Sequence, residues 1–394
     1  MKIALVVIAY NRIVSVKRLI QSLLRADYDD GVDLIISIDK SKTHIVEDFA
    51  DTVVWPFGEK RVIKHHENLG LRKHIMSQGE HFNKYDALVI LEDDLVVSPC
   101  FFYYVTQTVS KYSTDGRIAG ISLYSFNMNY QRQFPFEPIK TEYDAYFMKC
   151  AMSWGQVWLK NQWEEFYLWY QNNLNFEYST EIPRSLYTWP DSSWLKYHTR
   201  YCIEREKYFV YPYVSLTTDY SDVGTHNNDA SNTTVYQVGL QRGNKKSFNL
   251  PEFMEKAVKY DGFFENEELY STLNMTPQNC SLDIVGGNNN QSKKRFWLTT
   301  TKAPFKVVSS WGMRMRPIEV NIIENVPGSD IFLYDTSEKT HNGKKKNSNN
   351  LILFNYRLPN LFSLMRMYGV KSFYLDPIHT LLRKVVIKIN KKKK

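Results

Sequence analysis

Residues 88–97, with the sequence LVILEDDLVV, are the stretch that indicates the fold class. Two hydrophobic runs flank three consecutive acids, Glu92, Asp93 and Asp94. A run such as ALVIL at 87–91 is typical of a strand buried in a mainly parallel sheet. Open α/β sheets bind ligands beyond the carboxyl ends of such strands. An acidic surface turn after a strand is the alternative interpretation.

The three adjacent carboxylates repel one another, so they are costly to hold together unless a cation lies among them. Hard carboxylate oxygens suit Mg²⁺ or Mn²⁺, and such an ion can also hold a diphosphate. The stretch therefore predicts a divalent metal site that serves a nucleotide.

The residues before this stretch alternate between predicted strands and helices. Hydrophobic runs predict strands at 3–9, 34–38 and 62–64, and apolar residues at helical spacing predict helices at 13–24 and 71–82. This order is typical of an α/β nucleotide-binding half with a parallel sheet. The first strand is followed by the loop YNR rather than by a glycine-rich loop, which argues against a Rossmann dinucleotide site and a P-loop.

Polar side chains stand at the ends of three of these strands. Arg12 follows the first strand, Asp39 follows the second, and Glu92 to Asp94 end the acidic strand. If the strands are parallel, these side chains lie at one edge of the sheet. There an arginine could bind phosphate, an aspartate could bind a base or ribose, and the acids could bind a metal. Taken singly, Arg12 also fits a solvated loop and Asp39 a turn.

The composition is that of a soluble globular protein, with 43% hydrophobic and 23% charged residues among 394. The net charge of +8 does not indicate nucleic-acid binding, because much of it comes from lysine runs at 344–346 and 391–394. The 4 cysteines form no CxxC pair, which leaves a zinc site unsupported and favours a reducing compartment. Residues 3–9 are too short to cross a membrane as a helix, so we expect a cytoplasmic protein.

Several ordered segments between residues 3 and 226 resemble the GT-A glycosyltransferases, most closely N-acetylglucosaminyltransferase I and its relatives. These segments are VIAYNR (7–12), SID (37–39), LEDDLVVSPCFF (91–102), SWGQVW (153–158), the run from Trp189 to Trp194, and YVSLT…GTH (213–226). The fourth segment resembles the start of an aromatic helix, which we expect here up to about residue 170. The resemblance covers somewhat more than half of the chain and implies a GT-A fold, with a Rossmann-like mixed, mainly parallel sheet flanked by helices.

The resemblance also assigns a role to each candidate residue. Asp94 would bind the Mn²⁺ that bridges the nucleotide diphosphate, while Glu92 and Asp93 would support the donor sugar and the ribose. Asp39 would contact the uracil, and Arg12 would bind the diphosphate or the base. The expected cofactor is therefore Mn²⁺ or Mg²⁺, and the expected donor is a UDP-sugar.

Asp191 and His226 are two further candidates. The resemblance makes Asp191 the catalytic base of an inverting transfer, but Pro190 precedes it and two serines follow it where the family has consecutive acids. The alternative for Asp191 is the N-cap of a helix that begins at Ser192. His226 follows Gly-Thr and could close over the donor as a metal ligand or diphosphate contact, although a lone histidine is more often structural.

The chain beyond about residue 250 shows no such resemblance. We expect a GT-A domain at 1–245, a small β-rich appendage at 246–336, a linker or loop at 337–350 and a C-terminal segment at 351–394. Apolar residues from Ile378 onward at helical spacing, followed by the terminal lysines, predict a basic amphipathic helix at the end of this extension. The helix could contact the anionic inner face of the cytoplasmic membrane or pack on the protein's own core.

These observations predict a metal-dependent inverting glycosyltransferase. It would move N-acetylglucosamine or a related hexose from a UDP-sugar to a glycan or lipid-linked glycan, as in bacterial surface-polysaccharide assembly. One alternative is a sugar nucleotidyltransferase, although the glycine-rich loop expected of such an enzyme is missing. Another is a carbohydrate- or nucleotide-binding protein that has the same fold and no catalytic activity.

Overall fold

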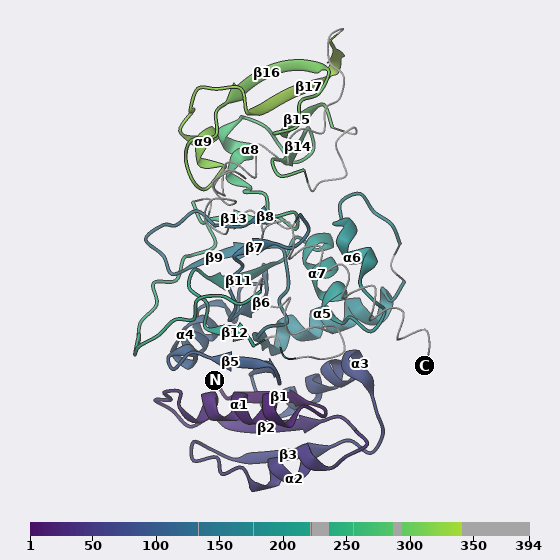
Figure 1. Cartoon of the computed structure of the whole chain (residues 1–394), viewed down its shortest axis with the longest axis vertical. Coiled ribbons are helices and arrows are strands. Elements are labelled where there is room, and N and C mark those ends of the chain that lie inside the picture. The colour runs from purple at the N-terminus through teal and green to yellow at the C-terminus, as the bar shows by residue number, and fades with distance from the viewer. Residues whose placement is uncertain are drawn as a thin grey trace, which may run out of the picture.

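The computed structural model describes residues 1–340, except 133, 176, 221, 223–235, 255 and 287–293. Within these residues the largest element is a nine-stranded sheet (Figure 1). From edge to edge its strands are β3 (Lys60–Lys64), β2 (Asp33–Ile38), β1 (Ile3–Ala9), β4 (Ala87–Glu92), β10 (Gln156–Leu159), β6 (Ile118–Ser122), β11 (Tyr208–Pro212), β9 (Ala145–Met148) and β13 (Lys259–Tyr260).

The directions of these strands confirm the predicted fold class, α/β with a mixed, mainly parallel sheet. Strands β3, β2, β1 and β4 run parallel, and so do β6 and β11. Strand β10 is antiparallel to both of its neighbours, and β9 is antiparallel to β11. The carboxyl ends of β1, β2 and β4 therefore lie at one edge of the sheet.

The sheet is covered on both faces, which explains why central strands such as β1 and β4 are almost continuously apolar. Every residue of β1 is buried, and successive side chains enter two different cores. The helices α1 (Ile13–Leu24), α2 (Ile45–Thr52) and α4 (Phe101–Tyr112) contribute to one core. The helices α3 (Gly70–Ser77), α5 (Lys160–Asn172) and α7 (Leu195–Glu204) contribute to the other, and the short α6 (Arg184–Thr188) precedes α7.

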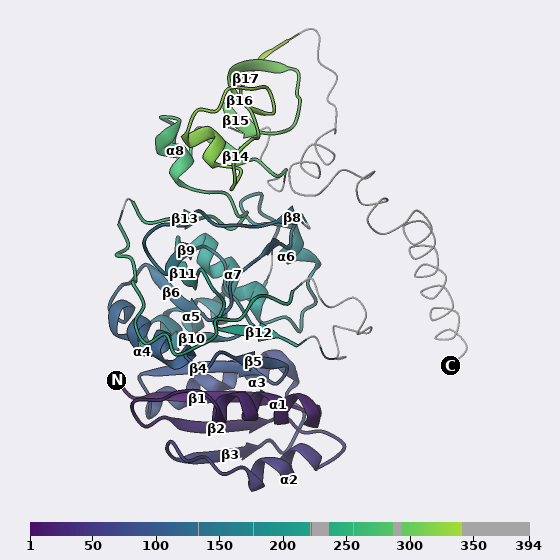
Figure 2. The ribbon, with the colours of Figure 1, turned by 60° about the vertical axis from the view of Figure 1, so that its left-hand side comes forward.

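A second, smaller sheet forms the β-rich C-terminal part, at the β13 end of the molecule (Figure 2). In order, its strands are β14 (Cys280–Asp283), β15 (Phe296–Thr299), β17 (Ile331–Lys339) and β16 (Phe305–Trp311), with α8 (Glu268–Thr272) and α9 (Val320–Ile323) beside them. It has a core of its own, which includes Leu282, Leu298 and Leu333. The predicted boundaries at 245 and 336 stay a prediction, and the C-terminal segment with its amphipathic helix lies outside the described residues.

The structure corrects several predicted elements. Residues 156–158 of the SWGQVW segment form strand β10 together with Leu159, and the aromatic helix begins only at Lys160, because the alternating side chains of β10 fill both cores between β4 and β6. Helix α2 was not expected from the sequence, since only three of its eight residues are buried. The predicted helix 71–82 divides into α3 and the 3-10 helix Gln78–Asn83.

Two short strand pairs lie outside the two larger sheets. Strands β7 (Met128–Asn129) and β8 (Phe134–Pro135) form one of them. Strand β5 (Leu95–Val97) pairs with β12 (Thr217–Asp219), so residues 217–219 lie beside the strand that directly follows the acids. Among the described residues, no helix combines the length and the apolar character needed to cross a membrane.

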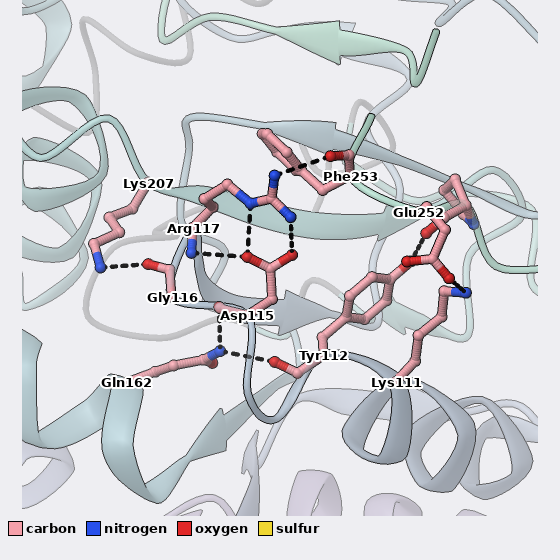
Figure 3. A network of polar contacts seen from close by, with 10 residues as sticks. Lys111, Tyr112, Asp115, Gly116, Arg117, Gln162, Lys207, Glu252 and Phe253 are labelled. Atoms are coloured by element: carbon pink, nitrogen blue, oxygen red, sulfur yellow. Dashed lines mark hydrogen bonds and ion pairs between the residues drawn. The ribbon is translucent and has the colours of Figure 1, made fainter. Parts of the chain in front are cut away.

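A polar network lies at the amino ends of β6 and β11, on the side of the sheet opposite the acids (Figure 3). Both carboxylate oxygens of Asp115 accept hydrogen bonds from the Arg117 guanidinium, at 2.8 and 2.7 Å. Arg117 also donates to the carbonyl oxygen of Phe253 at 3.0 Å, and Gln162 of α5 donates to that of Tyr112 at 3.3 Å. This network ties α4, α5 and the 251–253 segment together far from the acidic edge.

Candidate functional site

The carboxyl edge of the sheet brings Arg12 together with two of the acids. Residue Ile8 lies opposite Glu92 in the β1–β4 register, so the loop after β1 and the turn after β4 leave the sheet side by side. The Nη2 atom of Arg12 is 2.9 Å from Oδ2 of Asp94 and also pairs with Oδ1 of Asp93. These contacts join a cation from one strand end to two carboxylates from the next.

The charges in this group stabilise one another. Burial alone would lower the pKa of Arg12, but the charges of Asp93 and Asp94 outweigh it and raise the pKa above its usual value. Burial raises the pKa of Asp93 to about 6, although Arg12 acts in the opposite direction. Oδ1 of Asp94 is buried and has no hydrogen-bond partner among the described residues. A buried carboxylate oxygen without a partner is unfavourable, so this atom suits a cation.

Glu92 faces a different environment from the other two acids. Its side chain lies on the same face of β4 as Ile90 and accepts a hydrogen bond from Trp194. Burial, followed by the charges of Asp94 and Asp93, raises the pKa of Glu92 to about 8. Glu92 therefore links the acids to the segment that ends at Trp194.

Asp191 lies in that segment but does not point into the protein. Its side chain is 96% exposed, and its Oδ1 is 2.9 Å from the buried Nζ of Lys196. The hydrogen bond and charge of Lys196 lower the pKa of Asp191. Helix α7 begins at Leu195, with Trp194 in the N-cap position, so the alternative of Asp191 as an N-cap is wrong. Its role as a catalytic base stays a prediction.

Asp39 is buried and is fully engaged by backbone N–H groups. Its carboxylate accepts hydrogen bonds from the backbone nitrogens of Lys40, Leu69 and Gly70, at 2.9, 2.8 and 3.0 Å. Gly70 has a φ of 71°, a left-handed conformation that glycine adopts without strain. Asp39 thus fixes the loop that enters α3, while its predicted contact with uracil stays a prediction.

Two histidines lie beside this loop and were not expected to interact. The Nε2 atoms of His74 and His65 are 2.7 and 3.2 Å from the Ser37 hydroxyl on β2. Burial and the neighbouring His65 lower the pKa of His74 to about 4, so His74 is neutral at pH 7. The sequence shows these histidines, but it gives no sign that they share one serine.

A second group that the sequence did not reveal follows β12. The backbone nitrogen of Tyr220 donates to the Asp94 carbonyl oxygen at 2.9 Å. The guanidinium carbon of Arg18 lies 3.5 Å from the centre of the Tyr220 ring, and Arg18 donates to Asp222 at 2.7 and 3.2 Å. The loop after β12 is therefore attached to α1 beside the acids. His226 lies in the stretch just beyond, outside the described residues.

The metal prediction can be compared with this geometry. In the part of the chain that the structure describes, no three His, Cys, Asp or Glu side chains converge as metal ligands. Mg²⁺ and Mn²⁺ do not require such a cage, because Mg²⁺ is commonly held by one or two carboxylates together with water and substrate phosphate. The unpartnered Oδ1 of Asp94 fits this mode of binding.

A comparison with protein families matches the N-terminal part of the chain, which contains Arg12, Asp39 and the three acids. Residues 1–155, less than half of the chain, match the model of a family described as "Glycosyltransferase like family 2". No curated protein matches the chain. The matched residues hold β1 to β6, Arg12, Asp39 and the three acids. The glycosyltransferase character expected from the resemblance is supported for these residues, whereas the closer resemblance to N-acetylglucosaminyltransferase I stays a prediction.

Several solved structures are distantly similar in shape. S. aureus TarS 1-349 in complex with UDP has 13% identity and a TM-score of 0.35, over 54% of this chain and 57% of that chain. The same protein in complex with UDP-GlcNAc has 11% identity and a TM-score of 0.39, over 58% and 61%. The mannosyltransferase PcManGT from Pyrobaculum calidifontis in complex with GDP-Man and Mn²⁺ has 11% identity and a TM-score of 0.34, over 54% and 57%. This chain thus spans less than two thirds of each.

Proposed function

We propose that this protein is a metal-dependent glycosyltransferase that uses a nucleotide-sugar donor. The observation that carries the proposal is the contact of Arg12 with Asp93 and Asp94 at the carboxyl edge of a parallel sheet. This edge is where open α/β sheets bind nucleotides, and it lies within the residues that match the glycosyltransferase family. The donor is a UDP-sugar that carries N-acetylglucosamine or a related hexose, as the resemblance implies.

Each residue at this edge has its own role in binding the donor. Asp94 would hold Mn²⁺ or Mg²⁺ through its unpartnered oxygen, and the ion would supply positive charge that favours departure of the nucleoside diphosphate. Arg12 binds the diphosphate, since a guanidinium matches phosphate oxygens in pairs. Asp93 and Glu92 support the ribose and the donor sugar, and Asp39 orients the uracil from the loop that it fixes.

The acceptor is activated from the segment between Trp189 and Trp194. Asp191 is ionised at neutral pH and can take the proton of an acceptor hydroxyl as that hydroxyl attacks the anomeric carbon, which inverts the configuration. Help of this kind is worth roughly 10²–10⁴-fold in rate. The contact of Trp194 with Glu92 brings the segment to the acids, and three residues span at most about 11 Å, so Asp191 lies within that reach of Trp194. His226, which follows Gly-Thr in the sequence, would add a metal or diphosphate contact.

The acceptor is a glycan or a lipid-linked glycan. The basic amphipathic helix predicted near the C-terminus would place the enzyme on the inner face of the cytoplasmic membrane, where anionic lipid attracts lysine. Lysine-rich composition at 391–394 is the observation that supports this location, and the enzyme is otherwise cytoplasmic.

The experiment that tests the function is a thermal-shift panel of nucleoside diphosphates and their sugars, with and without Mn²⁺. We expect UDP-sugars to stabilise the wild type only when Mn²⁺ is present, and Asp94→Ala to lose this effect. Asp115→Asn at the opposite edge is the control and should keep it (Figure 3). Donor turnover is then measured as release of UDP with glycan acceptors.

The outcomes separate the proposal from its alternatives. Stabilisation without UDP release, whatever the acceptor, would indicate a binding protein. Release of pyrophosphate from a nucleoside triphosphate and a sugar phosphate would indicate a nucleotidyltransferase. A folded protein that no nucleotide stabilises would refute the donor site and make residues 92–94 an acidic turn.

A further inference from the structure

Arg12 has an unusual position for a half-buried cation. It stands in the N-cap position of α1, has no capping hydrogen bond from its side chain there, and keeps only 25% of its side chain exposed. The N-terminus of a helix carries partial positive charge, so a guanidinium is unfavourable at this end and an anion is favourable. The two aspartates, rather than the helix, therefore hold Arg12 in place.

The aspartates are incompletely satisfied by this single cation. Arg12 reaches Oδ1 of Asp93 and Oδ2 of Asp94 through one nitrogen, and Oδ1 of Asp94 keeps no partner among the described residues. With two ionised carboxylates and one guanidinium, the group carries a net charge of about −1. A divalent cation would satisfy the free oxygen, but it would lie close to the guanidinium and be repelled by it.

Binding of a diphosphate without the metal is also unfavourable. Without a metal the diphosphate would meet Asp93 and Asp94, whose charges repel it, and Arg12 could bind it only by leaving both carboxylates unneutralised. When metal and diphosphate arrive together, the metal neutralises the carboxylates and the guanidinium gains phosphate oxygens. Each ligand thus removes the obstacle to the other.

We propose that Arg12 is an internal counter-ion that couples metal and nucleotide binding. It neutralises Asp93 and Asp94 in the ligand-free site and transfers to the diphosphate when the metal replaces it on the carboxylates. This inference rests on the proposed donor site and adds to it the residue that couples the two ligands. Coupling between two ligands of one protein is typically 5–150-fold in affinity, so the effect is measurable.

Arg18 provides a matched control on the same helix. Arg18 carries the same charge as Arg12. Its guanidinium contacts Asp222 and the Tyr220 ring on the loop after β12, instead of Asp93 and Asp94. Arg18→Gln therefore removes one positive charge from α1 without freeing Asp93 or Asp94. If only the overall charge of α1 mattered, it would have the same effect as Arg12→Gln.

The test measures Mn²⁺ affinity by electron paramagnetic resonance of free Mn²⁺, with and without UDP, corrected for the Mn–UDP complex in solution. For the wild type we expect UDP to tighten Mn²⁺ binding at least about fivefold. For Arg12→Gln we expect Mn²⁺ alone to bind about tenfold more tightly than to the wild type, and UDP to tighten Mn²⁺ binding less than in the wild type, because only the repulsion between the carboxylates and the diphosphate then couples the two ligands. Arg12→Lys should restore the coupling because it restores the charge, and Arg18→Gln should keep it.

The possible failures are distinguishable. If the wild type binds Mn²⁺ and UDP but Arg12→Gln leaves both the Mn²⁺ affinity and the coupling unchanged, the inference is overturned and the donor site stands. The same conclusion follows if Arg18→Gln reduces the coupling as much as Arg12→Gln does. If the folded wild type binds neither ligand, the proposed function itself fails. Should Arg12→Gln not fold, Arg12→Lys decides: loss of coupling in that variant would contradict a role based on charge.

Discussion

Replacement of Asp261 by asparagine should make the protein more stable at neutral pH. Asp261 follows β13 at the junction with the β-rich part, and its Oδ1 accepts hydrogen bonds from the backbone nitrogens of Phe263 and Glu265, at 2.8 and 2.9 Å. Burial raises the pKa of Asp261 from 3.8 to about 7, against these hydrogen bonds. The amide oxygen of asparagine can accept the same two bonds without carrying a charge.

The magnitude follows from proton linkage. In the unfolded chain Asp261 loses its proton near pH 3.8, whereas in the folded protein it keeps it to about pH 7. Between these values the folded state binds more protons, so the stability of the wild type falls as the pH rises, by up to about 1.4 kcal/mol per pH unit. The whole effect reaches about 4 kcal/mol above pH 7 as an upper limit, because part of the side chain still contacts water. Asp261→Asn lacks this penalty.

Urea denaturation followed by tryptophan fluorescence at pH 4, 5.5, 7 and 8 measures the difference. The variant and the wild type should be nearly equal at pH 4, and the variant should gain an advantage that grows up to pH 7. Asp115→Asn is the control of opposite sign: Arg117 lowers the pKa of Asp115 below its usual 3.8, so this variant should be less stable than the wild type by a nearly constant amount between pH 5.5 and 8 (Figure 3). A variant of Asp261 that is less stable at pH 7, or that follows the wild type in parallel at every pH, would refute the reasoning.

Two further predictions concern packing and hydrogen bonding near the centre of the sheet. Gly120→Ala should destabilise the protein by about 1–3 kcal/mol, since the added Cβ would lie 2.6 Å from Cζ of Phe209; Gly116→Ala, which meets nothing within 4 Å, should be close to neutral in the same thermal unfolding assay. Trp194→Phe should cost about 1–3 kcal/mol because it removes the hydrogen bond to Glu92. Trp158→Phe should cost less, as its indole nitrogen has no hydrogen-bond partner among the described residues, and equal losses in urea denaturation would contradict this assignment.

The fold class and the residues at the strand ends can be predicted from short stretches of sequence. The apolar runs of β1 and β4 can be buried only in a sheet that is covered on both faces, so they predict a parallel α/β arrangement without further information. Because parallel strands end at the same edge, the residues directly after them, Arg12 and the acids at 92–94, had to lie near one another. The C-terminal β-rich part was also predicted, from stretches typical of strands such as those at 305–310 and 331–334.

Other features depend on contacts between residues far apart in the chain. Residues 156–159 form a strand because they pair with β4 on one side and β6 on the other, although the family resemblance predicts the start of a helix there. Asp39 binds amides thirty residues away, and Trp194 reaches Glu92 across about a hundred residues. The local sequence therefore determined which charged groups stand at the strand ends. Only the tertiary structure decided their partners, because the free energy of a buried charge depends on the groups that the fold places around it.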